Sequence, residues 1–463
     1  MGTDTSIKRY TLMVVSMASF LTPFMGSAVN LAIPSIGQEF SSSAFLLSWV
    51  ASSYLLASAA FLVPFGRLAD IIGRKKLFIL GISIFSISSI LCGLAWSIKT
   101  LIFFRILQGT GGAMIFATGM AILTSVFPPQ ERGKVLGINV ATVYTGLSLG
   151  PVLGGLMNHN LGWQSIFFLT AIIGMIATVF TILKLKGEWA GAKGESFDLK
   201  GAFLYSAGLI AFMYGISAVA TVFLAKYLLM LGVVVLAVFV YYELRAKTPV
   251  LNLSLFKNGI FAFSNLAAFI HYTATSGLGF LLSLYLQLIA GFDSQVAGLI
   301  LLSQPIMMAV LSPFAGSLSD RIEPRILASS GMGLTAIGLL VFSFISQTTP
   351  IWLVTATLAI MGIGFALFSS PNTNAVMSSV EKKFYGIASS TLGTMRLTGQ
   401  AISMTIVTLI ITLIVGNVEL TPANAAELVN AMKISFGLFM ILSIIGIFCS
   451  LARGNVQRDK GVS

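Results

Sequence analysis

The chain has 463 residues, of which 56% are hydrophobic and 9% are charged, and its formal net charge is +12. Soluble globular proteins carry roughly 25% charged residues, so this composition excludes that class and indicates a polytopic membrane protein. The basic residues are dispersed in short segments between apolar runs, which argues against a nucleic-acid-binding protein. The two cysteines, Cys92 and Cys449, lie in apolar segments without metal-ligand spacing, so we expect no disulfide framework and no zinc site.

The apolar segments predict an all-α protein, because about 20 consecutive apolar residues cross a bilayer as a helix. The first half contains six expected spans, near 11–35, 44–65, 77–96, 100–123, 135–157 and 166–185. A polar segment from Lys186 to Lys200 precedes two further spans that we expect to form a hairpin, near 201–221 and 225–243. Six more follow, near 260–290, 295–317, 326–347, 351–377, 387–415 and 433–452.

The expected architecture therefore has fourteen transmembrane helices in a six, two, six arrangement. We expect an N-terminal six-helix bundle at 1–186, cytoplasmic linkers and a two-helix insertion at 187–258, and a C-terminal six-helix bundle at 259–463. With the N-terminus inside, 22 of the 27 Lys and Arg residues fall in cytoplasmic segments and three in extracytoplasmic loops. This asymmetry follows the positive-inside rule and predicts that both termini are cytoplasmic.

A charged segment, Gly66 to Lys76, separates the second and third expected spans. Each of its five charges would cost about 2.5–3.5 kcal/mol in hydrocarbon, so we expect a cytoplasmic turn with helices ending on both sides. A similar design returns in the second half, where Pro313-Phe314 precedes Gly316 and the pair Asp320-Arg321. This repeated segment indicates that the helix bundle is duplicated.

This segment resembles the signature between the second and third helices of the major facilitator superfamily of secondary transporters. The matching positions are Gly66, Leu68, Asp70, Gly73, Arg74 and Lys75. The strings Phe197-Asp198-x-x-Gly201, Pro249 to Asn258, Pro371-Asn372-Thr373-Asn374 and Arg396-x-x-Gly399 are similar to the fourteen-helix drug:proton antiporter branch, which carries out multidrug efflux. The resemblance implies a monomeric, multi-pass transporter of the plasma membrane, embedded in the lipid bilayer, that moves a small-molecule substrate with protons as coupling ion. It implies no enzymatic activity, no cofactor, no metal and no nucleic-acid partner.

The fifth expected span carries small residues at Gly137, Gly146, Gly150-Pro151 and Gly154-Gly155. Small residues at this spacing form a groove against which another helix can pack, and the proline bends its helix. In the family this string is associated with exporters and with a hinge. Ordinary close packing explains the glycines equally well, and we expect both roles.

Arg105 lies within the fourth expected span. A basic side chain inside a membrane helix is a candidate functional group, because it must find carbonyls, water or a partner. The family resemblance implies a part in proton transfer. An equally good interpretation is that Arg105 bonds helix carbonyls and holds helices together.

The first expected span departs from the family pattern. Members that exchange cationic drugs for protons usually place an aspartate where this chain has Met25. All 15 Asp and Glu residues fall in expected loops or at helix ends, so the cavity lacks a carboxylate for a dication and the usual proton site.

The remaining candidates for a cavity wall are mostly neutral and polar: Asn30, Gln108, Asn139, Tyr144, Asn265, His271, Tyr272, Gln287, Gln304, Asn372, Asn374 and Gln400, with Arg105 and Arg396. His271 alone among them has an unperturbed pKa, about 6.5, that allows titration near neutral pH. A lone histidine in a helix is more often a packing residue than a proton carrier, so both interpretations stay open.

The sequence thus favours a secondary active transporter that works by alternating access, with its site between two halves related by a parallel repeat. Export of amphipathic or lipophilic molecules in exchange for protons is the first hypothesis. A facilitator or transporter of a neutral or anionic metabolite, without carboxylate-based coupling, is the second. An ATP-driven pump is disfavoured because the chain has no Gly-x-x-x-x-Gly-Lys-Ser/Thr loop, and a membrane enzyme or sensor because no intramembrane reactive group or large soluble domain is visible.

Overall fold

The computed structural model of the protein describes residues 2–127, 129–219, 222–246, 248–251, 253–319, 322–380, 385–416, 418 and 420–454. Its regular secondary structure consists of helices. The first half contains α1 (Gly2–Phe40), α2 (Ala44–Ile72), α3 (Arg74–Gly93), α4 (Ile98–Val126), α5 (Pro129–Leu161) and α6 (Gln164–Lys184). The insertion contains α7 (Leu199–Ala218) and α8 (Ala225–Glu243).

The second half begins after a short 3-10 turn, η1 (Leu253–Lys257). It contains α9 (Gly259–Thr275), α10 (Leu278–Leu284), the π-helical turn η2 (Tyr285–Ile289), α11 (Ser294–Leu301), α12 (Ser303–Ser319), α13 (Pro324–Ser343), α14 (Ile351–Ser378), α15 (Tyr385–Ile414), η4 (Pro422–Asn424) and α16 (Ala425–Ala452). Here α9, α10 and η2 form one span, and α11 and α12 form the next.

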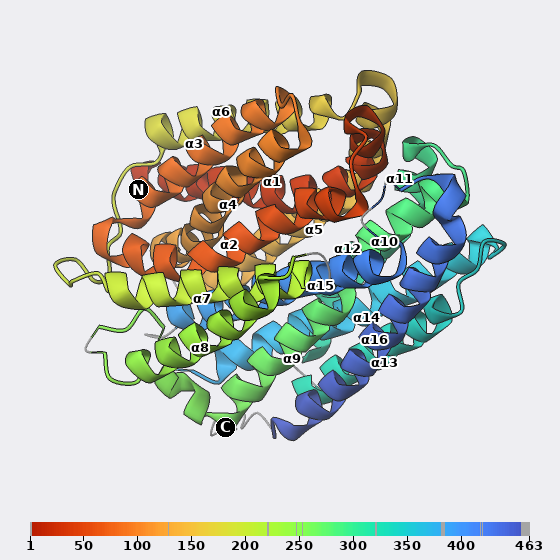
Figure 1. Ribbon diagram of the computed structural model, residues 1–463. Helices are drawn as coiled ribbons and strands as arrows, with labels where there is room; N and C mark the ends of the chain where they lie inside the picture. The colour runs from red at the N-terminus through yellow and green to blue at the C-terminus, as the bar shows by residue number, and fades with distance from the viewer. Residues whose placement is uncertain are drawn as a thin grey trace.

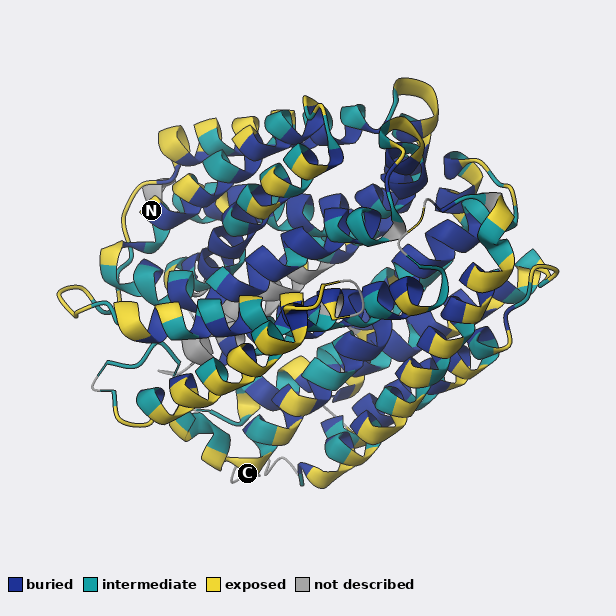
Figure 2. Cartoon of the chain, viewed as in Figure 1, coloured by how far each residue is buried: buried dark blue, intermediate teal, exposed yellow. Residues whose placement is uncertain are grey.

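Thirteen helical stretches of the described residues are long and apolar enough to cross a membrane. Helix α5 is not among them, because several side chains in its first part lie outside the described residues, yet it packs along α1 and α11 inside the bundle. With α5 counted, the all-α architecture of six, two and six spans is confirmed. Figure 2 shows buried residues where helices face one another and exposed residues on the outer sides, as expected of a lipid-facing surface.

The same packing pattern occurs in both halves. In the first half α1 packs on α5, α2 on α4, and α3 on both α4 and α6. In the second half α9 packs on α15, α12 on α14, and α13 on both α14 and α16. The halves meet through α2 with α15 and through α5 with α11 and α12, as a parallel repeat requires (Figure 1).

The insertion covers one side of the junction between the halves. Helix α7 packs on both α2 and α15. The Tyr205 hydroxyl donates to the Ala59 carbonyl at 3.1 Å, and Ser206 Oγ donates to the Ala60 carbonyl at 2.7 Å. Helix α8 packs on α7 and exposes much of its outer face (Figures 1 and 2).

The expected eleven-residue turn between the second and third spans is wrong. Helix α2 continues to Ile72 and α3 begins at Arg74, so Gly66 and Asp70 are helical and the break is Gly73 alone, at φ +116°. A positive φ of this size is accessible to glycine at little cost. The charges need only lie beyond the hydrocarbon, and a helix end can carry them there as well as a loop.

Two spans that the sequence predicts as continuous are interrupted. The expected span 260–290 breaks at Ser276-Gly277, and the expected span 295–317 breaks at Leu302. The Gly277 N–H, which the break frees from the helical ladder, donates to Ser403 Oγ at 2.9 Å. Such interruptions are tolerated at membrane depth where the backbone is buried in protein or lines a cavity.

Candidate functional site

A cavity of about 220 Å³ lies between the two halves. Helices α1, α2, α4 and α5 form one wall, and α9 to α12, α14 and α15 form the other. The wall is amphipathic, with five aromatic side chains, three amides and two arginines: Tyr54, Phe116, Tyr144, Tyr272, Phe365, Asn30, Gln304, Gln400, Arg105 and Arg396. Within the described part of the chain, no Asp or Glu lines this cavity.

The two helix breaks shape the wall of the second half. Thr275, Ser276 and Gly279 line the cavity at the first break. Leu301, Gln304 and Pro305 line it at the second. Both interruptions therefore lie at the cavity wall, as discontinuous helices do at the binding sites of transporter folds.

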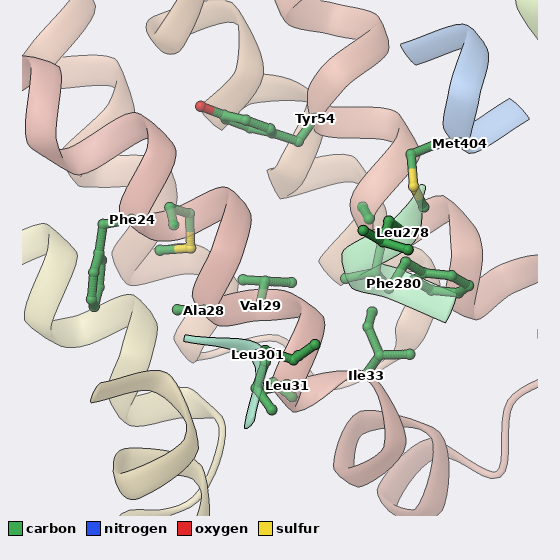
Figure 3. Close-up of a cluster of buried hydrophobic side chains, with 14 of the residues drawn as sticks. Phe24, Ala28, Val29, Leu31, Ile33, Tyr54, Leu278, Phe280, Leu301 and Met404 are labelled. Carbon is green, nitrogen blue, oxygen red and sulfur yellow. The ribbon is translucent and has the colours of Figure 1, made fainter. Parts of the chain in front are cut away.

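One end of the junction is closed by direct contacts between the halves. Ser283 Oγ donates to the Asn30 carbonyl at 2.5 Å, Gln287 Nε2 to the Leu31 carbonyl at 3.3 Å, and Ser294 Oγ to the Gly155 carbonyl at 3.1 Å. An apolar cluster of α1, α10 and α11 packs beside these bonds (Figure 3). It includes Leu31, Ile33, Leu278, Phe280 and Leu301. On the orientation predicted from the basic residues, this end is extracytoplasmic.

The glycines of α5 lie in close helix contacts. A Cβ on Gly146 would lie 2.5 Å from the Phe20 carbonyl oxygen, one on Gly150 2.6 Å from Ser27 Cβ, and one on Gly154 2.7 Å from Ala28 Cβ. Gly155 instead faces Ser294 of α11, and the Pro151 carbonyl lies against Gly298. The glycine face thus packs α5 on α1 and contacts the second half, while its action as a hinge stays a prediction.

Arg105 is buried and fully engaged. Its side chain is 1% exposed, Nε donates to the Val50 carbonyl at 2.9 Å, and Nη1 donates to Gln108 Oε1. Gln108 in turn donates to Ser89 Oγ at 2.6 Å. The guanidinium also lies 4.4 Å from the ring centroid of Tyr54. This residue connects α4 to α2 and α3, and its part in proton transfer stays a prediction.

Arg396 lies in a different environment. Its guanidinium lies 5.6 Å from the Phe116 ring centroid and 5.7 Å from that of Tyr272, between the two halves. It has no hydrogen-bond or ion-pair partner among the residues that the structure describes. Its side chain is therefore free to bind a ligand in the cavity.

His271 lies behind the cavity wall. It is 0% exposed, and neither ring nitrogen has a hydrogen-bond partner among the described residues. The ring centroids of Phe368, Phe365 and Tyr272 lie 4.0, 4.5 and 5.8 Å from the centroid of the His271 ring. Since Tyr272 and Phe365 line the cavity, His271 is one layer removed from it.

Seven more predicted cavity residues do not lie on the wall: Met25, Gln108, Asn139, Asn265, Gln287, Asn372 and Asn374. Met25 is fully buried in the core of the first half, because its face of α1 packs inward. Gln108 lies behind Arg105. Asn372 donates to the Ser264 carbonyl, and Asn374 donates to Ser319 Oγ at 3.0 Å, so both amides serve helix contacts. The structure does place Asn30, Tyr144, Tyr272, Gln304 and Arg396 on the wall.

The charged signature forms a network within the first half. Arg74 binds Asp70, with Nη2–Oδ1 at 2.7 Å, and its Nη1 donates to Ser125 Oγ of α4 at 2.6 Å. The segment after α6 joins this network, since Arg67 pairs with Glu195. Both oxygens of Glu188 accept backbone N–H groups of the first turn of α3, at 2.8 and 3.2 Å. The second-half counterparts, Asp320 and Arg321, lie outside the described residues.

Sequence reasoning missed three groups of residues. The aromatic wall residues Tyr54, Phe116 and Phe365 lie on helices that are apolar on all sides, so no periodicity marks them. The contact of Glu188 with the first turn of α3 had no sequence signal, because Glu188 lies in a polar segment without a recognisable motif. Arg453, which directly follows the last expected span, is 3% exposed and donates to Asn372 Oδ1 at 2.9 Å and the Pro324 carbonyl at 2.8 Å, and burial lowers its pKa to about 10.

Comparisons with a protein family, with individual relatives and with solved structures all match this chain to transporters. The profile of the Major Facilitator Superfamily matches residues 15–267 and 264–461. The chain is 31% identical over 392 residues to the riboflavin transporter RibZ of Clostridioides difficile, covering 84% of this chain and 85% of the relative. It is 31% identical over 405 residues to the multidrug resistance protein Stp of Mycobacterium tuberculosis (strain CDC 1551 / Oshkosh), covering 86% and 74%. The structure of a bacterial homologue of the human lysosomal transporter Spinster, inward-facing and unoccupied, superposes with a TM-score of 0.70 at 16% identity, covering 96% and 97%.

Proposed function

The chain belongs to the Major Facilitator Superfamily, and we propose that this multi-pass transporter of the cell membrane exports amphipathic or lipophilic small molecules in exchange for protons. The observation that carries the proposal is the amphipathic cavity between the halves, which has one end closed by contacts between those halves. Rocking the halves about this cavity would open that end and close the other, which is alternating access. The name of one relative, the multidrug resistance protein Stp, supports the export of drug-like compounds.

Transport by purified protein in proteoliposomes tests the proposal. Liposomes with and without an imposed pH gradient should be loaded with cationic, neutral and anionic aromatic probes. The proposal expects protein-dependent flux of at least one probe and its accumulation against a concentration gradient only when the pH gradient is present. Flux that ignores the gradient would remove proton coupling, and no protein-dependent flux of any probe would remove the export function.

The second candidate, a facilitator or transporter of a neutral or anionic metabolite, is favoured by one observation. The described cavity wall contains two arginines and no carboxylate, so it lacks the acid that usually binds the coupling proton. The same liposome assay separates the candidates, because a facilitator equilibrates its substrate whatever the gradient.

If coupling exists, we propose His271 as the group that carries the proton. It is the intramembrane side chain with a fitting intrinsic pKa, and neither ring nitrogen has another partner among the described residues. His271→Gln keeps hydrogen-bonding groups but removes titration, so it should flatten the pH dependence and preserve downhill flux. Unchanged gradient-driven accumulation would leave His271 as a packing residue within the aromatic rings around it.

A further inference from the structure

We infer that the substrates of this cavity are compact planar aromatic anions and that Arg396 is the residue that binds their negative charge. The inference rests on the proposed transport function and names its substrate class. Three properties of the described cavity lead to it: an unpartnered arginine, a wall without carboxylates, and aromatic rings from both halves near that arginine.

The first property is the free guanidinium. Arg396 is half-buried in the cavity, so water can reach its guanidinium until a ligand with acceptor groups replaces that water. Arg105 shows how this chain satisfies such a group, with a carbonyl, an amide oxygen and a tyrosine face. Arg396 has aromatic neighbours but no acceptor among the described residues. A carboxylate, sulfonate or phosphate of a ligand would complete it, and a planar guanidinium binds such groups through two parallel hydrogen bonds.

The second property is the positive charge of the cavity wall. Two arginines line the cavity, and no described Asp or Glu does. Unlike charges attract and like charges repel more strongly in a partly buried cavity than in bulk water, because the effective dielectric constant is lower. A cationic ligand would meet repulsion with no compensating carboxylate, whereas an anion would meet attraction. The wall therefore selects against the cationic compounds that an acidic cavity would bind.

The third property is the arrangement of rings. Phe116 comes from the first half and Tyr272 from the second, and the guanidinium of Arg396 lies within 6 Å of both ring centroids. A flat ring beside Arg396 would contact both halves at once, and stacking on aromatic side chains favours planar ligands. The volume, about 220 Å³, is below the ~300–1,000 Å³ of typical drug sites, so a compact ring system fits best.

Equilibrium binding to the full-length protein in neutral-lipid nanodiscs tests the inference. The probes share one ring system and differ in charge: 9-anthracenecarboxylate, 9-anthracenemethanol and 9-anthracenemethylammonium. Empty nanodiscs give the partition background. We expect the carboxylate to bind at least about tenfold more tightly than the ammonium, because a hydrogen bond to a charged group is at stake.

Three variants assign the charge recognition. Arg396→Gln should weaken binding of the carboxylate by about tenfold or more and leave binding of the alcohol within about twofold. Arg396→Lys keeps the charge without the planar fork and should give intermediate affinity. Arg325→Gln, which removes a positive charge at the start of α13 outside the cavity, should bind like the wild type.

Two results would overturn the inference without affecting the proposed function. One is equal or tighter binding of the ammonium probe, and the other is unchanged carboxylate affinity in Arg396→Gln. Transport in liposomes separates these cases from failure of the proposed function. Flux of the alcohol or ammonium probe with no preference for the carboxylate would contradict the substrate class alone, whereas no protein-dependent flux of any of the three would contradict transport itself.

Discussion

The two walls of the cavity differ in how they are built. The wall of the first half consists of continuous helices, and its arginine, Arg105, is fully engaged by neighbouring groups. The wall of the second half contains two interrupted spans, and its arginine, Arg396, has no acceptor among the described residues. The same residue type therefore holds helices together in one half and is free to meet a ligand in the other.

This difference shows that the repeat conserves packing without conserving the site. Helix partners correspond between the halves. The groups that face the cavity do not, because the breaks at Ser276-Gly277 and Leu302 alter only the second-half wall. A duplicated scaffold can thus carry the arginine without a protein acceptor in one half only.

The largest expected effect is on the unfolding free energy, when Arg105 or Arg396 is replaced by glutamine in two separate variants. Arg105→Gln removes the side-chain hydrogen bonds to the Val50 carbonyl and to Gln108 and the contact with Tyr54, so we expect a loss of about 2–4 kcal/mol of unfolding free energy. Arg396→Gln breaks no hydrogen bond to a described residue, so the unfolding free energy should change by no more than about 0.5 kcal/mol. Unfolding of the purified, ligand-free variants measures both. Equal losses would break the comparison between the walls.

The next prediction tests the rigidity of the first-half wall. Gly150→Leu places a side chain where a Cβ alone would lie 2.6 Å from Ser27 Cβ, so it should cost about 1–3 kcal/mol and abolish transport. Gly333→Leu is the matched control, because a Cβ there meets nothing within 4 Å. Transport per molecule of inserted protein is the measurement. If both variants transport normally, α5 does not depend on this close contact.

A smaller effect on stability is expected where α2 meets α3 in the first half. Asp70→Asn removes the pair with Arg74, which is partly exposed and should be worth at most about 1 kcal/mol. We nevertheless predict strongly reduced transport with normal insertion, because the network joins α2, α3 and α4. Glu427→Gln, an exposed acid at the start of α16, serves as control. Wild-type transport in a well-expressed Asp70→Asn protein would exclude a role for the pair in the cycle.

The smallest expected effect concerns the segment after α6. Glu188 accepts the N–H groups of Lys75 and Lys76, so Glu188→Gln should weaken the start of α3 by about 0.5–1 kcal/mol. Hydrogen exchange of the first turn of α3 should accelerate, while exchange of α13 in the second half stays constant. Unchanged exchange at Lys75 and Lys76 would show that this carboxylate does not stabilise the helix start.

The helix order was predictable from the sequence, and most of the cavity was not. Apolar length and the distribution of basic residues are strong signals, so the six, two, six arrangement follows from them. Which side of a helix faces the cavity is a matter of rotation, and a helix that is apolar on all sides carries no amphipathic pattern. For that reason Met25 and His271 were expected on the wall but lie behind it, while Tyr54 and Phe116 were overlooked.

The helix breaks have only a weak signal in the sequence. Ser276-Gly277-Leu278-Gly279 and Gln304-Pro305 combine small residues or proline with polar side chains inside apolar runs. Each is compatible with a continuous helix, so length alone favoured unbroken spans. The prediction of a turn at the charged segment was wrong because charged residues were taken to mark the ends of helices. Charge shows where the hydrocarbon region ends, and a helix can continue beyond that point.

The central claim is that the two halves rock about the cavity, and pulsed spin-label distances test it most directly. Labels on Asn160 of α5 and Val296 of α11 report on the closed end, and labels on Ile72 of α2 and Ile326 of α13 report on the other, in protein lacking Cys92 and Cys449; all four labelled positions are exposed. Under a pH gradient with a transported probe, the account predicts that the first distance lengthens while the second shortens in the same fraction of molecules. Two distances that stay constant under every condition would contradict alternating access in this protein.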